Sequence, residues 1–442
     1  MKKKFCTNQA VVLGSQGFIF LHGMGLFLYN LFIALYSFLI RVVSLFNKKA
    51  KLFITGRKGG LARIAQYFSD NTAPVAWFHV ASLGEFEQAK PVMEAFREKY
   101  PNHKLFITFF SPSGYELRKD YQGADCIAYL PVDTSRNARQ LLNAVNPSLV
   151  VFVKYEFWYH YLNEANQRKI PLYCVSALFT PNHIFFKPYG GLHRRMLGFF
   201  DHLFVQNEQS AQLLAGIGLA QVSISGDTRF DRVVKTLADP ERYPVVEAFK
   251  GSAPVMVIGS SWPSDMVFLY DIINKSVTDL KFVIAPHEVH ESSVSQLEKG
   301  LERKSVRITQ ASEAEAAAAE VLIVDTIGML SSIYQYGSFA YIGGAFGDGL
   351  HNILEAVTFG LPVIFGNKGL EKFPESLELQ GLGGAFSFGQ KEELLNIYQR
   401  LSTDEAYRKA ASAVCKTYIR EHTGATERIM AHLHTHYEGK GN

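Results

Sequence analysis

The sequence is poor in cysteine. Its four cysteines, Cys6, Cys126, Cys174 and Cys415, are scattered, and none stands in a CxxC pair or a Cys/His cluster with metal-ligand spacing. The cysteine pattern therefore gives no support for a metal-binding module. Cys126 and Cys174 fall in apolar runs, which predicts small buried side chains in a reducing compartment.

The sequence also lacks a strong charge of either sign. It has 45 Lys and Arg against 41 Asp and Glu, a net charge of +4. A nucleic-acid-binding protein usually has a larger basic excess, so we expect no nucleic-acid partner. The hydrophobic content of 48% over 442 residues is ample for two globular domains, each with its own core.

One long stretch near the N-terminus lacks charge altogether. Residues 17–40 have no charged side chain if His22 is neutral, and 24 residues of helix span about 36 Å, enough to cross a bilayer core of about 30 Å. Basic residues from Arg41 to Lys58 follow, which predicts an anchor with the main body in the cytoplasm. A helix lying in the membrane interface is an alternative to a spanning one, and Met24 is an alternative start.

After Pro74, short apolar runs alternate with longer helix-like stretches. The runs before residue 237 are VAWFHVAS, LFITFFS, CIAYLP, SLVVFVK, PLYCVSA, HLFVQN and VSISG, and those after residue 254 are VMVIGSS, KFVIAPH, SVRIT, VLIVDT, FAYIGG, PVIFG and GAFSF. Because the runs are apolar on both faces and far apart in the chain, they read as buried parallel strands. The predicted fold class is α/β, with two doubly wound, Rossmann-like domains facing a cleft.

The pattern divides the chain into five parts. They are an N-terminal anchor at 1–47, a first Rossmann-like domain at 48–236, a proline-rich polar linker at 237–254, a second Rossmann-like domain at 255–403 and a helical tail at 404–442.

Three charged residues follow strands of the first half, where ligands of such folds bind. Glu85 follows the first run at the start of a helix, and is a candidate general base or, alternatively, a complement to the helix dipole. Glu156 follows the fourth run among aromatic residues and is a site candidate, or else a capping or paired carboxylate. Arg229 follows the turn at Gly226 and can face the cleft, unless it belongs to a salt-bridge group with nearby aspartates.

Four strand ends of the second half carry further candidates. GSSWPSD opens a helix, APHE ends a second strand and DTIGML a third. The fourth segment, GGAFGDGLHNILEA, is rich in glycine, and its N–H groups could hold a phosphate. The glycines concerned are Gly343, Gly344, Gly347 and Gly349. Glu355, in the helix that follows, could accept hydrogen bonds from both ribose hydroxyls.

Together these segments resemble the 3-deoxy-D-manno-octulosonic acid (Kdo) transferases of lipopolysaccharide synthesis. The matching features are the apolar N-terminal segment and the motifs HVASLGE, KYEFW, GDTRFD, GSSW, APHE, DTIGML and GGAFGDGLHNILEA. The resemblance implies a GT-B fold and an inverting transfer of Kdo from CMP-Kdo to a lipid A precursor of the lipid IVA type. It also implies work at the cytoplasmic face of the inner membrane, with the first domain binding the acceptor and the second the donor.

By the family pattern, Glu85 would be the general base, Glu156 would assist in the transition state and Arg229 would stand where the family has lysine. The implied donor-binding residues are Ser260, Ser261, Pro286, His287, Ile327, Gly328, Met329, Asn352, Ile353, Leu354 and Glu355. Two of these depart from the family: His287 stands where Arg is common, and Met329 where Glu is usual. No Asp-x-Asp motif stands beside the glycine-rich loop, so we expect no metal and no cofactor.

Two other functions share parts of this pattern. Nucleotide-sugar epimerases of the UDP-N-acetylglucosamine type have the same architecture and a similar GDT turn, but they are soluble, and the apolar N-terminal segment argues against them. A non-catalytic membrane scaffold with a degenerate transferase fold is the second alternative, and the presence of both Glu85 and Glu156 argues against it.

Overall fold

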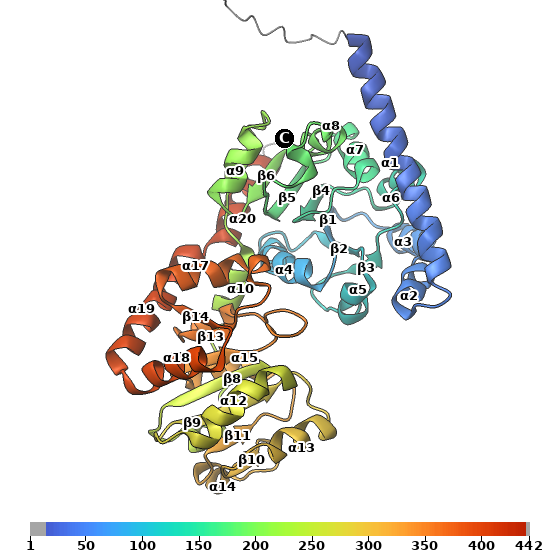
Figure 1. The fold of residues 1–442 in the computed structure, drawn as a ribbon. Helices are drawn as coiled ribbons and strands as arrows, with labels where there is room; N and C mark the ends of the chain where they lie inside the picture. The colour runs from blue at the N-terminus through green and yellow to red at the C-terminus, as the bar shows by residue number, and fades with distance from the viewer. Residues whose placement is uncertain (1–14, 439–442) are drawn as a thin grey trace, which may run out of the picture. The chain divides into compact units, whose positions relative to one another are not determined.

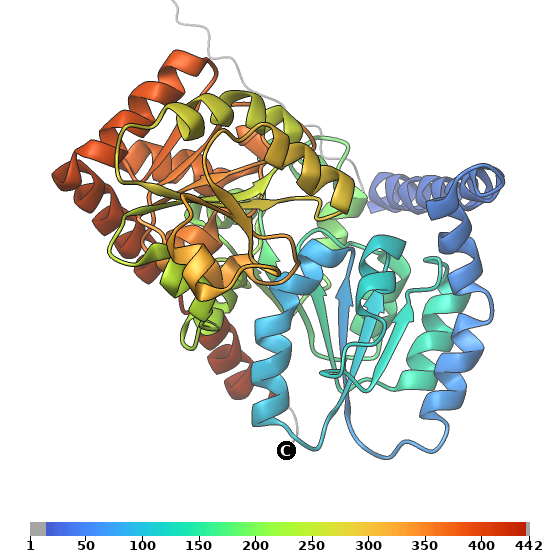
Figure 2. The same ribbon diagram turned by 90° about the horizontal axis from the view of Figure 1, so that it is seen from below.

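The computed structural model describes residues 15–438, which form two compact units. The first unit comprises Met1–Arg229 and Gly424–Asn442, and the second comprises Phe230–Thr423. Each unit is a parallel sheet with helices on both faces (Figures 1 and 2). The predicted fold class, two doubly wound α/β domains and an apolar N-terminal helix, is confirmed. Residues 1–14 of the predicted anchor lie outside the described residues.

The sheet of the first unit has the strand order β3-β2-β1-β4-β5-β6-β7, with every neighbouring pair parallel. All seven runs predicted as strands form strands. They are β1 (Val75–Val80), β2 (Lys104–Phe109), β3 (Cys126–Tyr129), β4 (Leu149–Val153), β5 (Leu172–Ala177), β6 (His202–Val205) and β7 (Val222–Ile224). The order reverses at β1, which lies between β2 and β4, so the crevice at the carboxyl ends of β1 and β4 is where this fold binds ligands.

Helices cover both faces of this sheet. They are α1 (Ser15–Val43), α2 (Lys48–Arg57), α3 (Gly60–Phe68), α4 (Leu83–Lys99), α5 (Pro112–Arg118), α6 (Ser135–Val145), α7 (Tyr159–Gln167), α8 (Gly191–Leu197), α9 (Glu208–Ala215) and α20 (Ala425–Glu438), with the short 3₁₀ helix η1 (Ile184–Phe186). Successive residues of β1 face opposite sides: Trp77 packs with α3 and α6, and Phe78 with α4 and α20. Figure 2 shows α4 and α3 on opposite faces of the sheet.

The N-terminal helix α1 is docked to the first unit by one narrow stripe. The hydroxyl of Tyr29 donates to Asp133 Oδ2 (2.5 Å), the ring Nε2 of His160 lies 2.7 Å from Asn30 Oδ1, and Ile33 is buried. The opposite side, which includes Phe27 and Phe38, is exposed. Within the described residues, Met24–Val43 is apolar and long enough to cross a membrane, with a mean hydropathy of 2.0, although a signal sequence or a core helix passes the same test.

The sheet of the second unit has the order β10-β11-β9-β8-β12-β13-β14 and is also parallel throughout. Its strands again match the seven predicted runs. They are β8 (Val255–Ser261), β9 (Lys281–Pro286), β10 (Ser305–Arg307), β11 (Val321–Ile323), β12 (Phe339–Ile342), β13 (Val363–Gly366) and β14 (Ala385–Phe388). Here the order reverses at β8, between β9 and β12, which places a second ligand-binding edge at the ends of β8 and β12.

The helices of the second unit lie on both faces of its sheet, as the two core clusters show. They are α10 (Thr228–Leu237), α11 (Pro244–Lys250), α12 (Pro263–Lys275), α13 (Glu291–Lys299), α14 (Glu313–Ala317), α15 (Leu330–Ile333), α16 (Leu354–Thr358), α17 (Pro374–Leu382), α18 (Lys391–Thr403) and α19 (Glu405–His422), with the 3₁₀ helices η2 (Tyr334–Tyr336) and η3 (Leu370–Lys372). The first two residues of α10 belong to the first unit.

The compact units do not follow the predicted boundaries. Residues 237–254, expected to be a linker, contain α11, whose Val246 and Phe249 are buried in the core of the second unit. The predicted tail is two helices that separate at Gly424, which has a left-handed φ of 90°. Of these, α19 belongs to the second unit and α20 to the first, where Ile429 and Leu433 pack beneath the sheet. Only the burial of each helix shows which core it joins.

Candidate active site

Glu85 begins the helix that leaves the central strand of the first unit. It is the third residue of α4, and Ser82 is the N-cap. The backbone N–H of Ser82 donates to Glu85 Oε2 (3.1 Å), and the Ser82 hydroxyl donates to the same oxygen, which makes a capping box. The helix-start alternative from the sequence is therefore observed. Because both bonds use Oε2, Oε1 remains available for a ligand.

Glu156 follows β4, the neighbouring strand on the other side of the switch point. Its Oε2 accepts a hydrogen bond from the indole N–H of Trp158 (2.7 Å) and lies 3.2 Å from Nε2 of His79. The backbone turns sharply just before it, since Lys154 has a left-handed φ of 63°. The side chain of Glu156 is 14% exposed, so the carboxylate is held mainly by these two partners but still reaches the surface.

A buried polar row that the sequence analysis missed leads to Glu156. His79 of β1 has no exposed side-chain surface, and its Nδ1 lies 2.8 Å from the hydroxyl of Thr108 in β2. The indole N–H of Trp77 donates to that same hydroxyl (2.8 Å). The only signal in the sequence was a histidine and a threonine inside runs that were otherwise apolar.

The side chain of Tyr155 lies close to Glu85 and Asp227. Burial and, to a smaller extent, the negative charges of Glu85 and Asp227 together raise the pKa of the Tyr155 hydroxyl to about 12. Charges act in this way only over short distances. Glu85, the segment that carries Glu156, and the GDT turn therefore lie around one aromatic side chain.

Arg229 is engaged by its own turn. Its Nε donates to Asp227 Oδ2 (2.8 Å) and its Nη2 lies 2.8 Å from the same atom, while Gln88 donates to Asp227 Oδ1 (3.1 Å). Asp227 is nearly buried, whereas the Arg229 side chain is 34% exposed. The salt-bridge alternative stated from the sequence is thus present. A catalytic role for Arg229 stays a prediction, and it would have to use the exposed part of the guanidinium.

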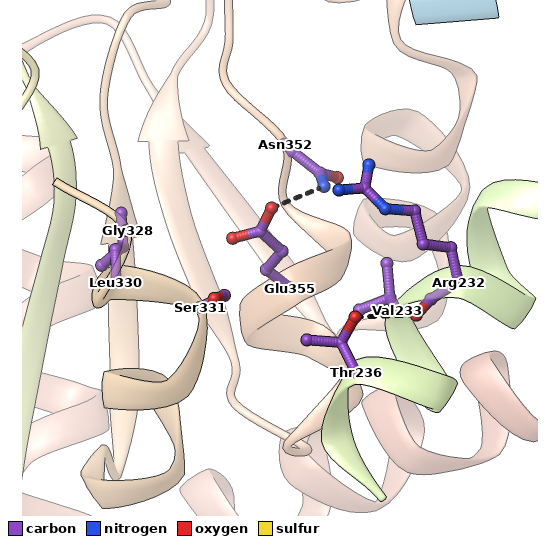
Figure 3. Close-up of a pocket in the computed structure, with 8 residues that line it drawn as sticks. All are labelled: Arg232, Val233, Thr236, Gly328, Leu330, Ser331, Asn352 and Glu355. Atoms are coloured by element: carbon purple, nitrogen blue, oxygen red, sulfur yellow. Dashed lines mark hydrogen bonds between the residues drawn. The ribbon is translucent and has the colours of Figure 1, made fainter. Parts of the chain in front are cut away.

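In the second unit, three predicted donor residues line one cavity of about 270 Å³ (Figure 3). They are Gly328, Asn352 and Glu355, and the Asn352 amide donates to Glu355 Oε1 (3.2 Å). In Figure 3 the guanidinium of Arg232, from α10, points toward Asn352. Arg232 is not among the residues that the family resemblance assigns to the donor, so the cavity adds a cation to the predicted set.

Three other predicted donor residues line a second cavity, of about 410 Å³. Ser261, Pro286 and His287 lie there at the ends of β8 and β9. The hydroxyl of Ser261 is buried and has no hydrogen-bond partner among the described residues. Trp262 stacks on His287 with ring centroids 4.2 Å apart and donates its indole N–H to His351 Nε2 (3.1 Å). An orphaned hydroxyl beside a stacked aromatic pair suits a polar ligand with a flat ring.

The remaining predicted donor residues are placed less favourably. Ile353 and Leu354 are buried in the core, so only their backbone atoms could contact a ligand. Met329 is partly buried against that core, whereas Ile327 is 80% exposed. Ser260 has a left-handed φ of 52°, which bends the end of β8. Within the sequence NILE, the polar residues Asn352 and Glu355 are therefore the ones whose side chains can contact a ligand.

The N–H groups of the four glycines in the glycine-rich loop are not available for the predicted phosphate cradle. They are used inside the protein: Gly343 donates to Gly259 O (2.9 Å), Gly344 to Asp265 Oδ2 (3.0 Å), and Gly347 and Gly349 to Gly344 O (2.9 and 3.1 Å). The glycines instead let two segments of backbone pack closely, because a Cβ on Gly343 would lie 2.2 Å from Ser260 O. Among the described residues, no group of three or more His, Cys, Asp or Glu side chains could hold a metal ion.

Comparison with known proteins places these features in a family. Residues 58–232 match the family model described as 3-Deoxy-D-manno-octulosonic-acid transferase (kdotransferase). The chain is 27% identical over 306 residues to the 3-deoxy-D-manno-octulosonic acid transferase of Chlamydophila psittaci (strain ATCC VR-125 / 6BC), covering 67% of this chain and 70% of the relative. It is 24% identical over 356 residues to the Aquifex aeolicus (strain VF5) protein of that name, covering 77% and 91%.

Solved structures with the same fold include an epimerase and a glycosyltransferase. A UDP-GlcNAc 2-epimerase from Neisseria meningitidis, bound to UDP-GlcNAc, superposes with a TM-score of 0.56 at 14% identity, covering 82% of this chain and 100% of that one. The calicheamicin glycosyltransferase superposes with a TM-score of 0.51 at 13% identity, covering 82% and 98%. At these identities the likeness shows the GT-B type of fold alone. The motifs, the family model over residues 58–232 and the curated relatives agree on one family, the 3-deoxy-D-manno-octulosonic acid (Kdo) transferases.

Proposed function

We propose that this chain transfers Kdo from CMP-Kdo to a lipid A precursor of the lipid IVA type, with inversion at the anomeric carbon. The observation that carries the proposal is the pair of carboxylates at the ends of β1 and β4, where the strand order of the first unit reverses. Each carboxylate has one oxygen engaged and one available. That arrangement suits a reaction in which one group removes a proton while another stabilises developing charge.

In the proposed reaction, Glu85 takes the proton from the acceptor hydroxyl as its oxygen attacks the anomeric carbon of Kdo. CMP leaves from the opposite face of the sugar, so a single displacement inverts the configuration. Glu156 assists in the transition state, where positive charge develops on the sugar. Arg229 stays protonated at any relevant pH and would favour the Kdo carboxylate or the departing phosphate, sharing its guanidinium with Asp227.

The donor would be held by the second unit. The cavity with Asn352 and Glu355 offers an amide and a carboxylate to the hydroxyls of a ribose, and Ser261 and His287 offer a hydroxyl and an imidazole from the neighbouring cavity. CMP is a monophosphate leaving group and carries less charge than a diphosphate. The proposal therefore includes no metal ion.

A lipid acceptor is supported by an apolar groove beside α1. The groove has a volume of about 380 Å³, and its residues are Tyr36, Leu39, Ile40, Val43, Asn47, Lys49, Ala50, Phe53 and Pro112. Tyr36 and Phe53 pack on Phe110, which stacks on Trp158 with ring centroids 4.6 Å apart. Trp158 in turn donates to Glu156. An acyl chain in the groove would thus bring its sugar headgroup toward the carboxylates along a continuous aromatic surface.

The same helix would hold the enzyme at the cytoplasmic face of the inner membrane. Because Tyr29 and Asn30 are bound to polar groups of the first unit, we favour α1 lying in the membrane interface over α1 crossing the bilayer. Its exposed apolar side would enter the lipid, and the lysines of 48–51 would meet anionic headgroups.

The test is to incubate the purified protein with CMP-Kdo and tetraacyl lipid A precursor and to weigh the lipid product. We expect lipid heavier by a whole number of Kdo residues, release of CMP, and an inverted linkage by NMR. A parallel incubation with UDP-N-acetylglucosamine tests the epimerase alternative. Epimerised sugar together with unchanged lipid would refute the proposal.

A further inference from the structure

His79 is a titratable side chain that neither carboxylate role accounts for. It lies in the middle strand of three, between Thr108 of β2 and Glu156 after β4, and its side chain is fully buried. Burying an imidazole is costly unless both ring nitrogens have partners. The partners therefore show what the side chain does.

The hydrogen-bond donors of this row fix the position of the His79 proton. The indole N–H of Trp77 can only donate, so the Thr108 hydroxyl accepts from it. That hydroxyl has one proton of its own and lies 2.8 Å from His79 Nδ1. If Nδ1 accepts this proton, Nε2 carries the ring hydrogen and donates to Glu156 Oε2 at 3.2 Å.

The other neutral tautomer fits poorly. With the proton on Nδ1, the ring could donate to the Thr108 carbonyl (3.1 Å), but the lone pair of Nε2 would then face an oxygen of the ionised Glu156. A doubly protonated ring would donate to both. In each arrangement that satisfies its partners, Nε2–H donates to Glu156.

We propose that His79 is a positioning residue that, through Glu156, sets the rate of sugar transfer. Its Nε2–H and the indole N–H of Trp158 both bind Oε2 from different parts of the chain, which turns Oε1 toward a ligand. The segment needs such a brace because it leaves β4 through the left-handed Lys154 rather than through a regular helix start. Thr108 acts one step further back, by fixing the His79 tautomer. The inference rests on the proposed function, in which Glu156 assists the transition state.

Two substitutions at His79 separate this role from plain structural packing. The amide nitrogen of Gln reaches about as far as Nε2 of His, whereas the shorter Asn reaches only as far as Nδ1. His79→Gln can therefore still donate to Glu156, and His79→Asn can satisfy Thr108 but not Glu156. We expect His79→Asn to lower kcat about 10²-fold, the scale of a misplaced catalytic group, with KM for both substrates within about threefold. His79→Gln should keep kcat within about tenfold of the wild type, and both variants should lose similar thermal stability.

Two further measurements keep the test decisive. Adding His79→Asn to Glu156→Gln should cost little beyond Glu156→Gln alone, because residues that act as a unit are not additive. Trp158→Phe removes the second donor to Glu156 Oε2 and should also lower kcat. Because Trp158 is only half-buried, this variant remains informative if the substitutions at the buried His79 prevent folding. Equal kcat losses in the Gln and Asn variants, or the same factor for His79→Asn with and without Glu156, would overturn the positioning role. The proposed function is judged separately, by whether the wild type adds Kdo to the lipid.

Discussion

Glu85→Gln is the substitution that separates the two uses of Glu85. The carboxylate caps α4 through Oε2 and is proposed to take a proton through Oε1. Glutamine is also accepted at this position of a capping box, so the start of α4 should survive. An amide cannot take the proton of a sugar hydroxyl. We therefore expect kcat to fall roughly 10²–10⁴-fold, which corresponds to about 2.7–5.4 kcal/mol of activation free energy.

The stability change expected from the same substitution is much smaller. Complete loss of an N-terminal cap typically costs about 0.5–2 kcal/mol, and glutamine retains part of the interaction. A loss of about 1 kcal/mol lowers Tm by only about 2–4 °C in a unit of this size. Residual unfolding at assay temperature therefore cannot account for a hundredfold loss of turnover. CMP binding, which the proposal assigns to the second unit, should be unchanged in the variant.

The chain offers a matched control in α14 of the second unit. Glu315 forms the same capping box, since Ser312 donates to Glu315 Oε2 through its backbone N–H (2.9 Å) and its hydroxyl (2.7 Å). Glu315→Gln should show a similar small shift in Tm and full turnover. The assay is the steady-state rate of Kdo addition to the lipid precursor, with melting followed on the same samples. A Glu85→Gln enzyme within threefold of wild-type kcat would remove Glu85 from the mechanism.

Three further outcomes follow from the same geometry. Arg229→Ala should raise the activation barrier by roughly 2–4 kcal/mol, whereas Arg229→Lys should keep much of the activity. Normal kcat with a lowered Tm in the alanine variant would mean that Arg229 serves only as the structural partner of Asp227. Activity should persist in excess chelator, and complete loss restored by Mg²⁺ would contradict the metal-free proposal. Replacing Phe27 and Phe38 by Ser on the exposed side of α1 should release the protein from anionic vesicles in a flotation assay, while Leu377→Ser, at an exposed position of the second unit, should not.

The strands were predictable because each is short, apolar on both faces and buried, a pattern that little else in a globular chain produces. Their parallel order followed from the long connections. The unit boundaries were not predictable in the same way. Residues 244–250 form a helix of only seven residues, too short for a clear helical period, yet its Val246 and Phe249 are buried in the core of the second unit. The assignment of α20 to the first unit likewise depends on where its buried face finds a partner.

For the glycine-rich loop, the sequence predicted the position of the glycines correctly but not the partners of their N–H groups. The sequence placed Gly343 and Gly344 at a strand end, and the structure agrees. Their N–H groups, however, are satisfied by Gly259 and by the buried Asp265 of α12. A pattern of glycines indicates that other atoms can approach the backbone closely. It does not indicate whether those atoms belong to a ligand or to the protein, because the hydrogen-bond partner of each N–H group comes from a different strand or helix.

The two carboxylates of the first unit differ in the same respect. Glu85 is held by Ser82, three residues away, so its structural partner is visible in the motif Ser-x-x-Glu. Glu156 is held in part by His79, 77 residues away, and His79 by Thr108, 29 residues further along the chain. These three residues become neighbours only because β2, β1 and β4 are adjacent in the sheet. A local cap can be replaced by any residue that caps, whereas a row across three strands needs a matching group at every step. Substitutions along the row should therefore reduce activity through geometry even where, as at Thr108, the residue is too deep to touch a substrate.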